Sequence, residues 1–276
     1  MRRVGAVAGT ASTVLSLLSL AGVAGATVDP GKATAPRMEF APPPPGSYEL
    51  QKIQRVSDAV LLDSTGRNVN LSALTQGKIT LLTFFYTYCV DPLGCPFAHT
   101  TLANLRDRVR GDATLAGRVR FVSVSLDPTH DTPAAIANYG QEFTIDPKFE
   151  WRFVTARRVT ELLPVLGDFG QDVSVDVDES GRATRTLHHM LKMFLIDARG
   201  EVREIYSLAF LQPQVMFNDI KTLALEADFH LACACRRSYP SVSVFKNTTM
   251  SLTSASLNAG GSLTCRSSGA CVSTLP

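Results

Sequence analysis

The sequence has almost no net charge and no stretch of clustered basic residues. Its 27 Lys and Arg residues nearly balance its 25 Asp and Glu residues, which leaves a formal charge of +2. Nucleic-acid-binding domains concentrate positive charge on one face, so this balance argues against that class. No internal repeat is visible along the 276 residues, which argues against a repeat architecture.

The N-terminus has the pattern of an export signal. Met1-Arg2-Arg3 precedes an uncharged stretch over residues 4–28, and small residues at 24 and 26 form a cleavage pattern after Ala26. The alternative is an uncleaved membrane anchor, because the uncharged stretch is long enough to span a bilayer. No cysteine lies near the cut, which argues against a lipid-anchored form. Either way, we expect the body of the protein to be exported, to a periplasm or the outer side of the cytoplasmic membrane.

Three further regions follow the signal peptide (1–26). Residues 27–47 contain four consecutive prolines and predict a stiff, extended linker. Residues 48–230 predict one folded domain, and residues 231–276 a tail rich in serine and threonine that is loose except where cysteines tie it. A domain of about 180 residues buries roughly 70% of its unfolded surface and needs no disulfide to fold.

The hydrophobic pattern predicts alternating strands and helices closed by an antiparallel hairpin. Strands are expected at 79–85, 119–126, 151–154, 192–197 and 202–207, and helices at 96–109, 133–143, 156–166 and 213–227. A short hairpin over 59–71, with its turn at 64–66, precedes them. The expected fold is therefore α/β, with a central mixed sheet flanked by helices and a C-terminal extension.

Two cysteines occupy the position where a thioredoxin-like fold carries its reactive thiols. Cys89 and Cys95 follow the apolar strand at 79–85, and Pro96 opens the next helix. A helix N-terminus favours thiolate over thiol, so the pair can exchange disulfides or hold a soft metal. Five residues separate the cysteines where a disulfide oxidoreductase usually has two, but Pro92 and Gly94 favour a turn that lets the sulfurs meet. A purely structural disulfide is the competing interpretation.

Two histidines precede the strand at 192–197, in a segment that passes beside the cysteine loop in thioredoxin-like folds. Redox members of that fold place a proline there, but this sequence has none between Pro164 and Pro213. Two thiolates and one imidazole suit copper, as Cu(I) or Cu(II). Zinc accepts the same ligands but normally takes a fourth. A lone histidine is otherwise an ordinary surface residue.

The sequence here resembles the Sco/SenC copper chaperones, which help to build the binuclear copper centre of cytochrome oxidase. The resemblance covers about residues 48–227. It rests on Phe-Tyr-Thr-Tyr-Cys at 85–89, Cys95-Pro96, Ser-Val-Ser-Leu-Asp-Pro at 123–128, Asp-Thr-Pro at 131–133, Trp151, and His189 five residues before Phe-Leu-Ile-Asp at 194–197. It implies copper binding by Cys89, Cys95 and His189, with His188 one residue off the family spacing. The implied partners are a copper-receiving protein, such as an oxidase copper-centre subunit, and a thiol reductant protein.

One departure from the family leaves a second function open. Most members have three residues between the cysteines, whereas this chain has five. The alternative to a copper chaperone, which is not an enzyme, is a thiol-disulfide oxidoreductase. In it Cys89 attacks a partner's disulfide and Cys95 resolves the mixed intermediate. A thiol peroxidase is a more distant third possibility, because no proline stands just before Cys89.

Weaker candidates surround these three residues. His99 is a possible substitute ligand or proton donor, but we expect a helix residue that faces solvent or the cysteine loop. Asp91 is expected to form a turn, and Asp127 and Asp131 to cap the following helix. The methionines at 190 and 193 offer soft sulfur, although residues at that spacing usually belong to a core.

The remaining cysteines lie towards the C-terminus. His230, Cys233 and Cys235 follow the last expected helix with the spacing of a possible second metal site. We expect disulfides instead, with Cys265 and Cys271 as partners of Cys233 and Cys235 in an order that the sequence does not fix.

Overall fold

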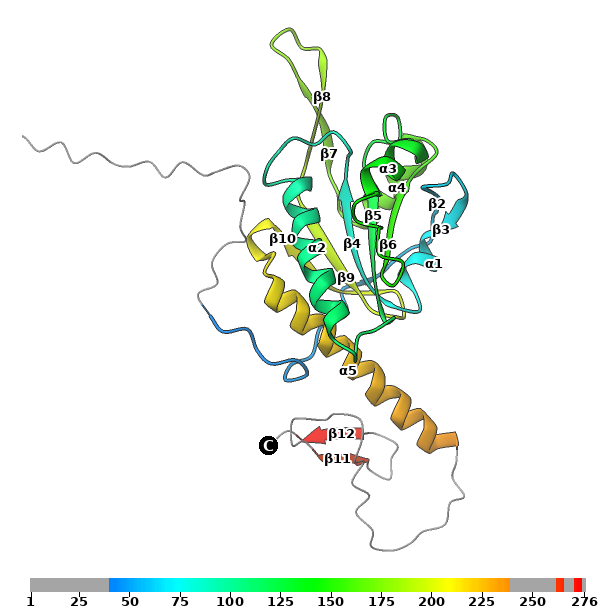
Figure 1. The fold of residues 1–276 in the computed structure, drawn as a ribbon, viewed down its shortest axis with the longest axis vertical. Coiled ribbons are helices and arrows are strands. Elements are labelled where there is room, and N and C mark those ends of the chain that lie inside the picture. The colour runs from blue at the N-terminus through cyan, green and yellow to red at the C-terminus, as the bar shows by residue number, and fades with distance from the viewer. Residues whose placement is uncertain (1–39, 239–261, 266–270, 275–276) are drawn as a thin grey trace, which may run out of the picture.

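The computed structural model describes residues 40–238, 262–265 and 271–274, with side chains described over 40–230. Its centre is one eight-stranded mixed sheet in the order β1-β10-β9-β4-β5-β6-β2-β3 (Figure 1). The strands of this sheet are β1 (Gln54–Arg55), β2 (Val60–Asp63), β3 (Asn68–Asn70), β4 (Ile79–Phe85), β5 (Val119–Ser125), β6 (Glu150–Thr155), β9 (Lys192–Ile196) and β10 (Glu201–Ser207). The α-helices are α1 (Leu71–Thr75), α2 (Cys95–Gly111), α3 (Pro133–Gly140), α4 (Val159–Asp168) and α5 (Pro213–Ser238), and a 3₁₀ turn, η2, covers Leu208–Phe210.

The sheet is buried on both faces at its centre. Every residue of β4 and β5 is buried, and the two strands run parallel, with Ile79 opposite Val119. Successive side chains of a strand point to opposite faces. Phe85 therefore packs on Tyr139 of α3 on one face, while Phe84 packs on Phe169, just after α4, on the other. Strands this apolar need elements on both sides, and the helices supply them.

The arrangement confirms the predicted thioredoxin-like α/β fold. β4, α2 and β5 form a parallel crossover, and β9 pairs antiparallel with both β4 and β10. α2 and α5 pack side by side (Figure 1). The reactive loop predicted between β4 and α2 thus lies at the carboxyl end of the central strand.

A second hairpin, absent from the sequence-based prediction, projects from the domain. β7 (Val173–Val177) pairs antiparallel with β8 (Ala183–His189) as a separate two-stranded sheet (Figure 1). The alternation of valines at 173, 175 and 177 and a turn glycine at 181 were the signals that could have found it. Its consequence is that His189 ends a strand rather than lying in a loop.

The last helix is longer than predicted. It continues past residue 227 to Ser238, so Cys233 and Cys235 belong to the helix and do not follow it. No glycine or proline interrupts the chain between 214 and 238, and leucine, alanine and arginine there favour helix. The backbone of the tail forms one short hairpin, β11 (Ser262–Cys265) with β12 (Cys271–Thr274), in which Cys265 stands opposite Cys271. The side chains of these cysteines lie outside the described residues, and the predicted disulfides stay predictions.

The proline run does not stand free as a spacer at its C-terminal end. Asn218 donates a hydrogen bond to the Pro43 carbonyl at 2.8 Å, and the Gly46 amide donates to the Thr222 hydroxyl at 2.9 Å. Gly46 has a φ of +77°, and a Cβ there would lie 2.9 Å from Leu225 Cδ1, so both the backbone conformation and the close approach favour glycine. Residues 43–46 are therefore bound to α5. The predicted signal peptide and the first part of the linker lie outside the described residues.

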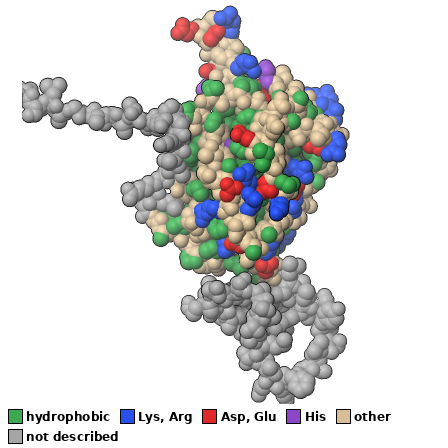
Figure 2. Space-filling view, in the orientation of Figure 1, with side chains coloured by type: hydrophobic (Ala, Val, Ile, Leu, Met, Phe, Trp, Pro, Cys, Tyr) green, Lys and Arg blue, Asp and Glu red, His purple; other side chains and the backbone are tan. Residues whose placement is uncertain are grey.

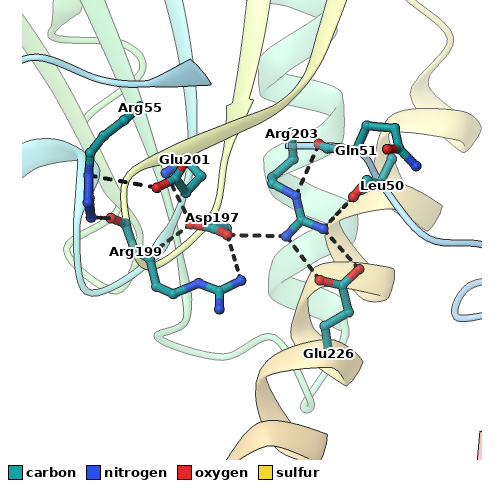
Figure 3. A network of polar contacts seen from close by, with 8 residues as sticks. All are labelled: Leu50, Gln51, Arg55, Asp197, Arg199, Glu201, Arg203 and Glu226. Atoms are coloured by element: carbon teal, nitrogen blue, oxygen red, sulfur yellow. Dashed lines mark hydrogen bonds and ion pairs between the residues drawn. The ribbon is translucent and has the colours of Figure 1, made fainter. Parts of the chain in front are cut away.

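A buried arginine ties the N-terminal segment to the sheet and to α5. Arg203 of β10 donates to the Leu50 and Gln51 carbonyls and to the carboxylates of Asp197 and Glu226, at 3.1 and 3.0 Å (Figure 3). Its side chain is 3% exposed. Its three nitrogens thus bind oxygens of the N-terminal segment, of the turn after β9 and of α5.

The outer surface carries charges of both signs. On the face shown in Figure 2, lysine and arginine side chains alternate with acidic ones. Within the described residues, no helix combines the length and the hydrophobicity needed to cross a bilayer.

Candidate thiol and metal site

The loop from β4 to α2 brings the two cysteines together despite the five residues between them. Leu93 donates its amide to the Asp91 carboxylate and Gly94 donates to the Asp91 carbonyl, both at 3.0 Å. This confirms Asp91 as a turn-forming residue. A Cβ at Gly94 would lie 3.1 Å from the Cys89 sulfur, so glycine leaves room for that sulfur beside the start of α2.

The two thiols are free and differ in environment. Cys89 is half-buried and Cys95, the first residue of α2, is fully buried. A hydrogen bond from the Cys95 thiol, helped by the Cys95 amide and the Tyr86 hydroxyl, lowers the pKa of Cys89 to about 5. The hydrogen bond to Cys89, together with burial, raises the pKa of Cys95. At neutral pH, Cys89 is therefore the thiolate and Cys95 keeps its proton.

Tyr86 stands between the thiolate and His189. Its hydroxyl hydrogen-bonds Cys89 and lies 3.4 Å from the Leu187 carbonyl, while its ring lies edge-on to the His189 ring at a centroid distance of 6.1 Å. Burial raises the pKa of Tyr86, so the phenol stays protonated and can donate. Sequence reasoning missed this residue, although it lies only three positions before Cys89.

The structure separates the two adjacent histidines. His189 faces Tyr86, and burial lowers its pKa, so the imidazole is neutral and has a free lone pair at neutral pH. His188 points to the opposite face of β8, is 62% exposed and lies 3.4 Å from Asp176. Of the two, only His189 is on the side of the thiols.

The candidate ligands are close but not assembled. Across residues 40–230, no three His, Cys, Asp or Glu side chains are grouped as a metal would require. Tyr86 contacts both Cys89 and the His189 ring. Joint coordination by Cys89, Cys95 and His189 would therefore bring these three side chains closer together than they lie here.

Asp127 and Asp131 do not cap the following helix as predicted. Thr132 caps α3, by accepting from the Ala135 amide. The fully buried Asp131 accepts from the Thr87 amide and hydroxyl, the latter at 2.6 Å, and from the Ser125 hydroxyl at 2.7 Å. Asp131 thus anchors the cysteine loop two residues before Cys89.

Asp127 also contacts a residue just before Cys89. It accepts from the Tyr88 hydroxyl and contacts His130 Nδ1 at 2.6 Å. The helix needs one cap, and because Thr132 supplies it, both aspartates are free to hold the residues before Cys89.

His99 faces the core instead of solvent or the cysteine loop. It is 1% exposed among aromatic rings, with its two nitrogens 2.8 Å from the Tyr139 hydroxyl and 3.2 Å from the Ser123 hydroxyl. Burial lowers its pKa to about 3, which keeps it neutral and structural. Met193 is buried in β9, as expected of a core residue, whereas Met190 is exposed.

The low pKa of Cys89 gives a direct prediction for its alkylation by iodoacetamide. Thiolate is the reacting species, so the rate should rise through pH 5 and be nearly constant between pH 6 and 8. An ordinary cysteine would gain on the order of 50- to 100-fold over that interval. Tandem mass spectrometry of the 79–106 tryptic peptide, which contains both cysteines, assigns the label to Cys89 or Cys95 and gives the rate at Cys89.

The Cys95→Ala variant is the control for this profile. Because the Cys95 thiol makes the largest contribution to the low pKa, its removal should move the inflection to higher pH. A parent profile that still climbs steeply between pH 7 and 9 would show that Cys89 is an ordinary thiol.

Comparisons with known proteins agree with this geometry. A sequence model of the SCO1/SenC family matches residues 50–225, more than half of the chain. The chain is similar in structure to Arabidopsis thaliana ScoI crystallised with copper bound, with 21% identity, a TM-score of 0.52, and coverage of 62% of this chain and 98% of that one.

A SCO1/SenC family lipoprotein from Bacillus anthracis is similar at 25% identity, with a TM-score of 0.52 and coverage of 62% and 95%. Yeast Sco1 shares the fold at 16% identity, with a TM-score of 0.51 and coverage of 64% and 98%. No curated protein matches the chain by sequence. The family match, the thioredoxin-like sheet and the paired thiols after β4 establish that this chain belongs to the SCO1/SenC family.

Proposed function

We propose that this protein binds copper through Cys89, Cys95 and His189 and delivers it to a cuproprotein, such as the copper-centre subunit of a respiratory cytochrome oxidase. The observation that carries the proposal is the meeting of a thiolate, a second thiol and a neutral imidazole around Tyr86. Soft sulfur suits Cu(I), and the imidazole nitrogen is also acceptable to Cu(II). Family membership and a structural relative crystallised with copper support it.

The donor set explains how copper would be taken up and released. Cys89 offers a thiolate without losing a proton at neutral pH, whereas Cys95 must lose one on binding. Copper held by these three side chains would pass to the acceptor protein by ligand exchange, as the ligands of the acceptor replace them one at a time. Copper loading should therefore release protons and require both thiols to be reduced.

The site of action proposed for this chain is outside the cytoplasm. Residues 1–26 have the pattern of a signal peptide or anchor, and an oxidising compartment would explain six cysteines in one chain. Copper delivery there depends on a thiol reductant protein, because oxidation of Cys89 and Cys95 to a disulfide removes both sulfur ligands.

Substitution of His189 tests the metal site. His189→Ala should weaken Cu(I) binding by at least about tenfold, the lower end of the effect of removing even an outer-shell partner of a metal. Competition with a Cu(I) chelator under argon measures the affinity. The matched control is His188→Ala, which removes the exposed neighbour and should leave the affinity unchanged.

The copper affinities of His189→Ala and of the parent also distinguish the second candidate function, disulfide exchange. A nucleophilic thiolate backed by a buried, protonated thiol also suits disulfide exchange: Cys89 attacks, and Cys95 resolves the mixed disulfide. Neither step uses His189. Parent-like copper affinity in His189→Ala would refute the ligand assignment, and weak copper binding by the parent itself, together with rapid thiol exchange, would favour the oxidoreductase.

A further inference from the structure

A groove leads to the cysteine loop from the side of the projecting hairpin. It has a volume of about 650 Å³ and lies between α4, the β7–β8 hairpin and the turn at 126–130. It reaches Tyr88, the residue before Cys89. Binding clefts of about 300–1,000 Å³, mostly apolar with a few polar groups, are typical of specific ligand sites.

The groove is lined by apolar side chains that the fold leaves open to water. Val159 and Leu163 of α4 are 46% and 55% exposed, and Val175 of β7 is 50% exposed. These side chains lie in two different elements around one depression. Apolar side chains gathered in this way mark an interaction surface more often than scattered ones do.

A buried amide in the lining indicates the kind of occupant. Gln171, between α4 and β7, is 5% exposed, and both its Nε2 and its Oε1 lack a hydrogen-bond partner. The side chain thus has one donor and one acceptor to satisfy. A backbone peptide group offers the complementary pair. An extended peptide presents free peptide groups, whereas a helix uses its own internally.

We propose that this groove receives an extended peptide segment of the protein that reacts with Cys89, and that Gln171 turns to pair with a backbone amide of that segment. Apolar side chains of the segment would lie on Leu163 and Val175. At the Tyr88 end of the groove, Arg185 covers the tyrosine ring at 4.6 Å. The inference rests on the proposed function for the identity of the partner, but groove occupancy can be tested without copper.

The test uses thiol exchange with two synthetic peptides and the full-length reduced protein. The first is acetyl-Thr-Val-Thr-Val-Ser-Gly-Cys-amide, activated as its thiopyridyl disulfide, and the second has both valines replaced by asparagine. The Cys89 thiolate attacks the peptide sulfur, a mixed disulfide forms, and pyridinethione leaves with the sulfur–sulfur bonding electrons. The measurement is made in a Cys95→Ala background, where the 79–106 peptide contains Cys89 alone and no neighbouring thiol resolves the mixed disulfide. The mass of this peptide then counts attachment at Cys89.

The valine peptide should react at least about tenfold faster than the asparagine peptide, because two apolar side chains enter the groove. Leu163→Asp and Val175→Asp should bring this ratio close to one. Val177→Asp is the matched control, since Val177 is 58% exposed on the same hairpin but outside the lining. Gln171→Leu should lower the rate of the valine peptide by about fivefold, the effect of one lost hydrogen bond to the peptide backbone.

Several outcomes would overturn the proposal. Equal rates for the two peptides with the parent protein would show that the groove does not bind the valine side chains. If Val177→Asp lowered the rate ratio as much as Leu163→Asp and Val175→Asp do, the added negative charge alone would explain the effect. A parent-like rate of Gln171→Leu with the valine peptide would refute the role of the amide. If Leu163→Asp or Val175→Asp changed the sedimentation coefficient of the protein but not the ratio of the two peptide rates, the groove would be an interface with a second copy of the chain.

Copper affinity separates this proposal from the proposed function. Leu163→Asp should bind Cu(I) as tightly as the parent, because Leu163 is not a ligand. Reaction with the small reagent 2,2′-dithiodipyridine should also be unchanged in the groove variants. A parent that binds no copper but keeps the tenfold peptide preference would refute the copper site and leave the groove intact.

Discussion

Cys89→Ser is expected to lose tight copper binding, with an affinity for Cu(I) at least about 100-fold below that of the parent. This exceeds the usual cost of removing an outer-shell partner of a metal, because the variant loses the thiolate itself. The remaining thiol, Cys95, is buried, and burial raises its pKa even without the hydrogen bond to Cys89. A Cu(I) competition titration measures the loss, and the thiolate charge-transfer bands of the Cu(II) form should disappear with it.

Cys233→Ser is the control for this experiment. It removes a thiol from α5, outside the proposed site, and should bind copper like the parent. If the losses in Cys233→Ser and Cys89→Ser were equal, copper would be held by thiols in general and not by the loop after β4. Parent-like binding by Cys89→Ser would place the metal elsewhere.

Arg203→Ala is expected to lower the free energy of unfolding by about 3–5 kcal/mol, the usual cost of removing one partner from a buried ion pair. The guanidinium satisfies two backbone carbonyls and two carboxylates, and its loss leaves these oxygens without their donor (Figure 3). Urea denaturation followed by circular dichroism measures the change, with the slope of the transition checked for two-state behaviour.

Arg199→Ala provides the comparison within the same network. Arg199 contacts the same Asp197 carboxylate at 3.3 Å, but its side chain is 51% exposed. Solvent screens such a pair, so its removal should cost less than about 1 kcal/mol. Equal losses in the two variants would show that burial of Arg203 adds nothing to the stability of the domain.

The sequence was informative where hydrophobic pattern alone decides the structure. The central strand was predicted at 79–85 and is observed as Ile79–Phe85, because a mostly apolar run with two threonines favours a strand buried on both faces. The position of the thiols after that strand followed directly. Their spacing did not obscure the site, because Asp91 and Gly94 fold the longer loop back on itself.

The features missed from sequence depend on contacts between distant residues. Asp131 was expected to cap a helix, since its neighbours fit that pattern, but its carboxylate is bound to Thr87, 44 positions away. His99 was expected to face solvent or the cysteine loop, one helical turn after Cys95, and only the surrounding rings explain its burial. The position of Tyr86 between Cys89 and His189 likewise arises from the pairing of β7 and β8.

The N-terminal segment meets the sheet at the pole away from the thiols. Ile53 donates its amide to the Val202 carbonyl, and Val202 is in register with Ile196, which pairs with Thr80 at the start of β4. Cys89 follows the opposite end of that strand, roughly 17 Å away at 3.3 Å per residue. An acceptor protein that approaches Cys89 therefore does not meet the contact between Ile53 and β10.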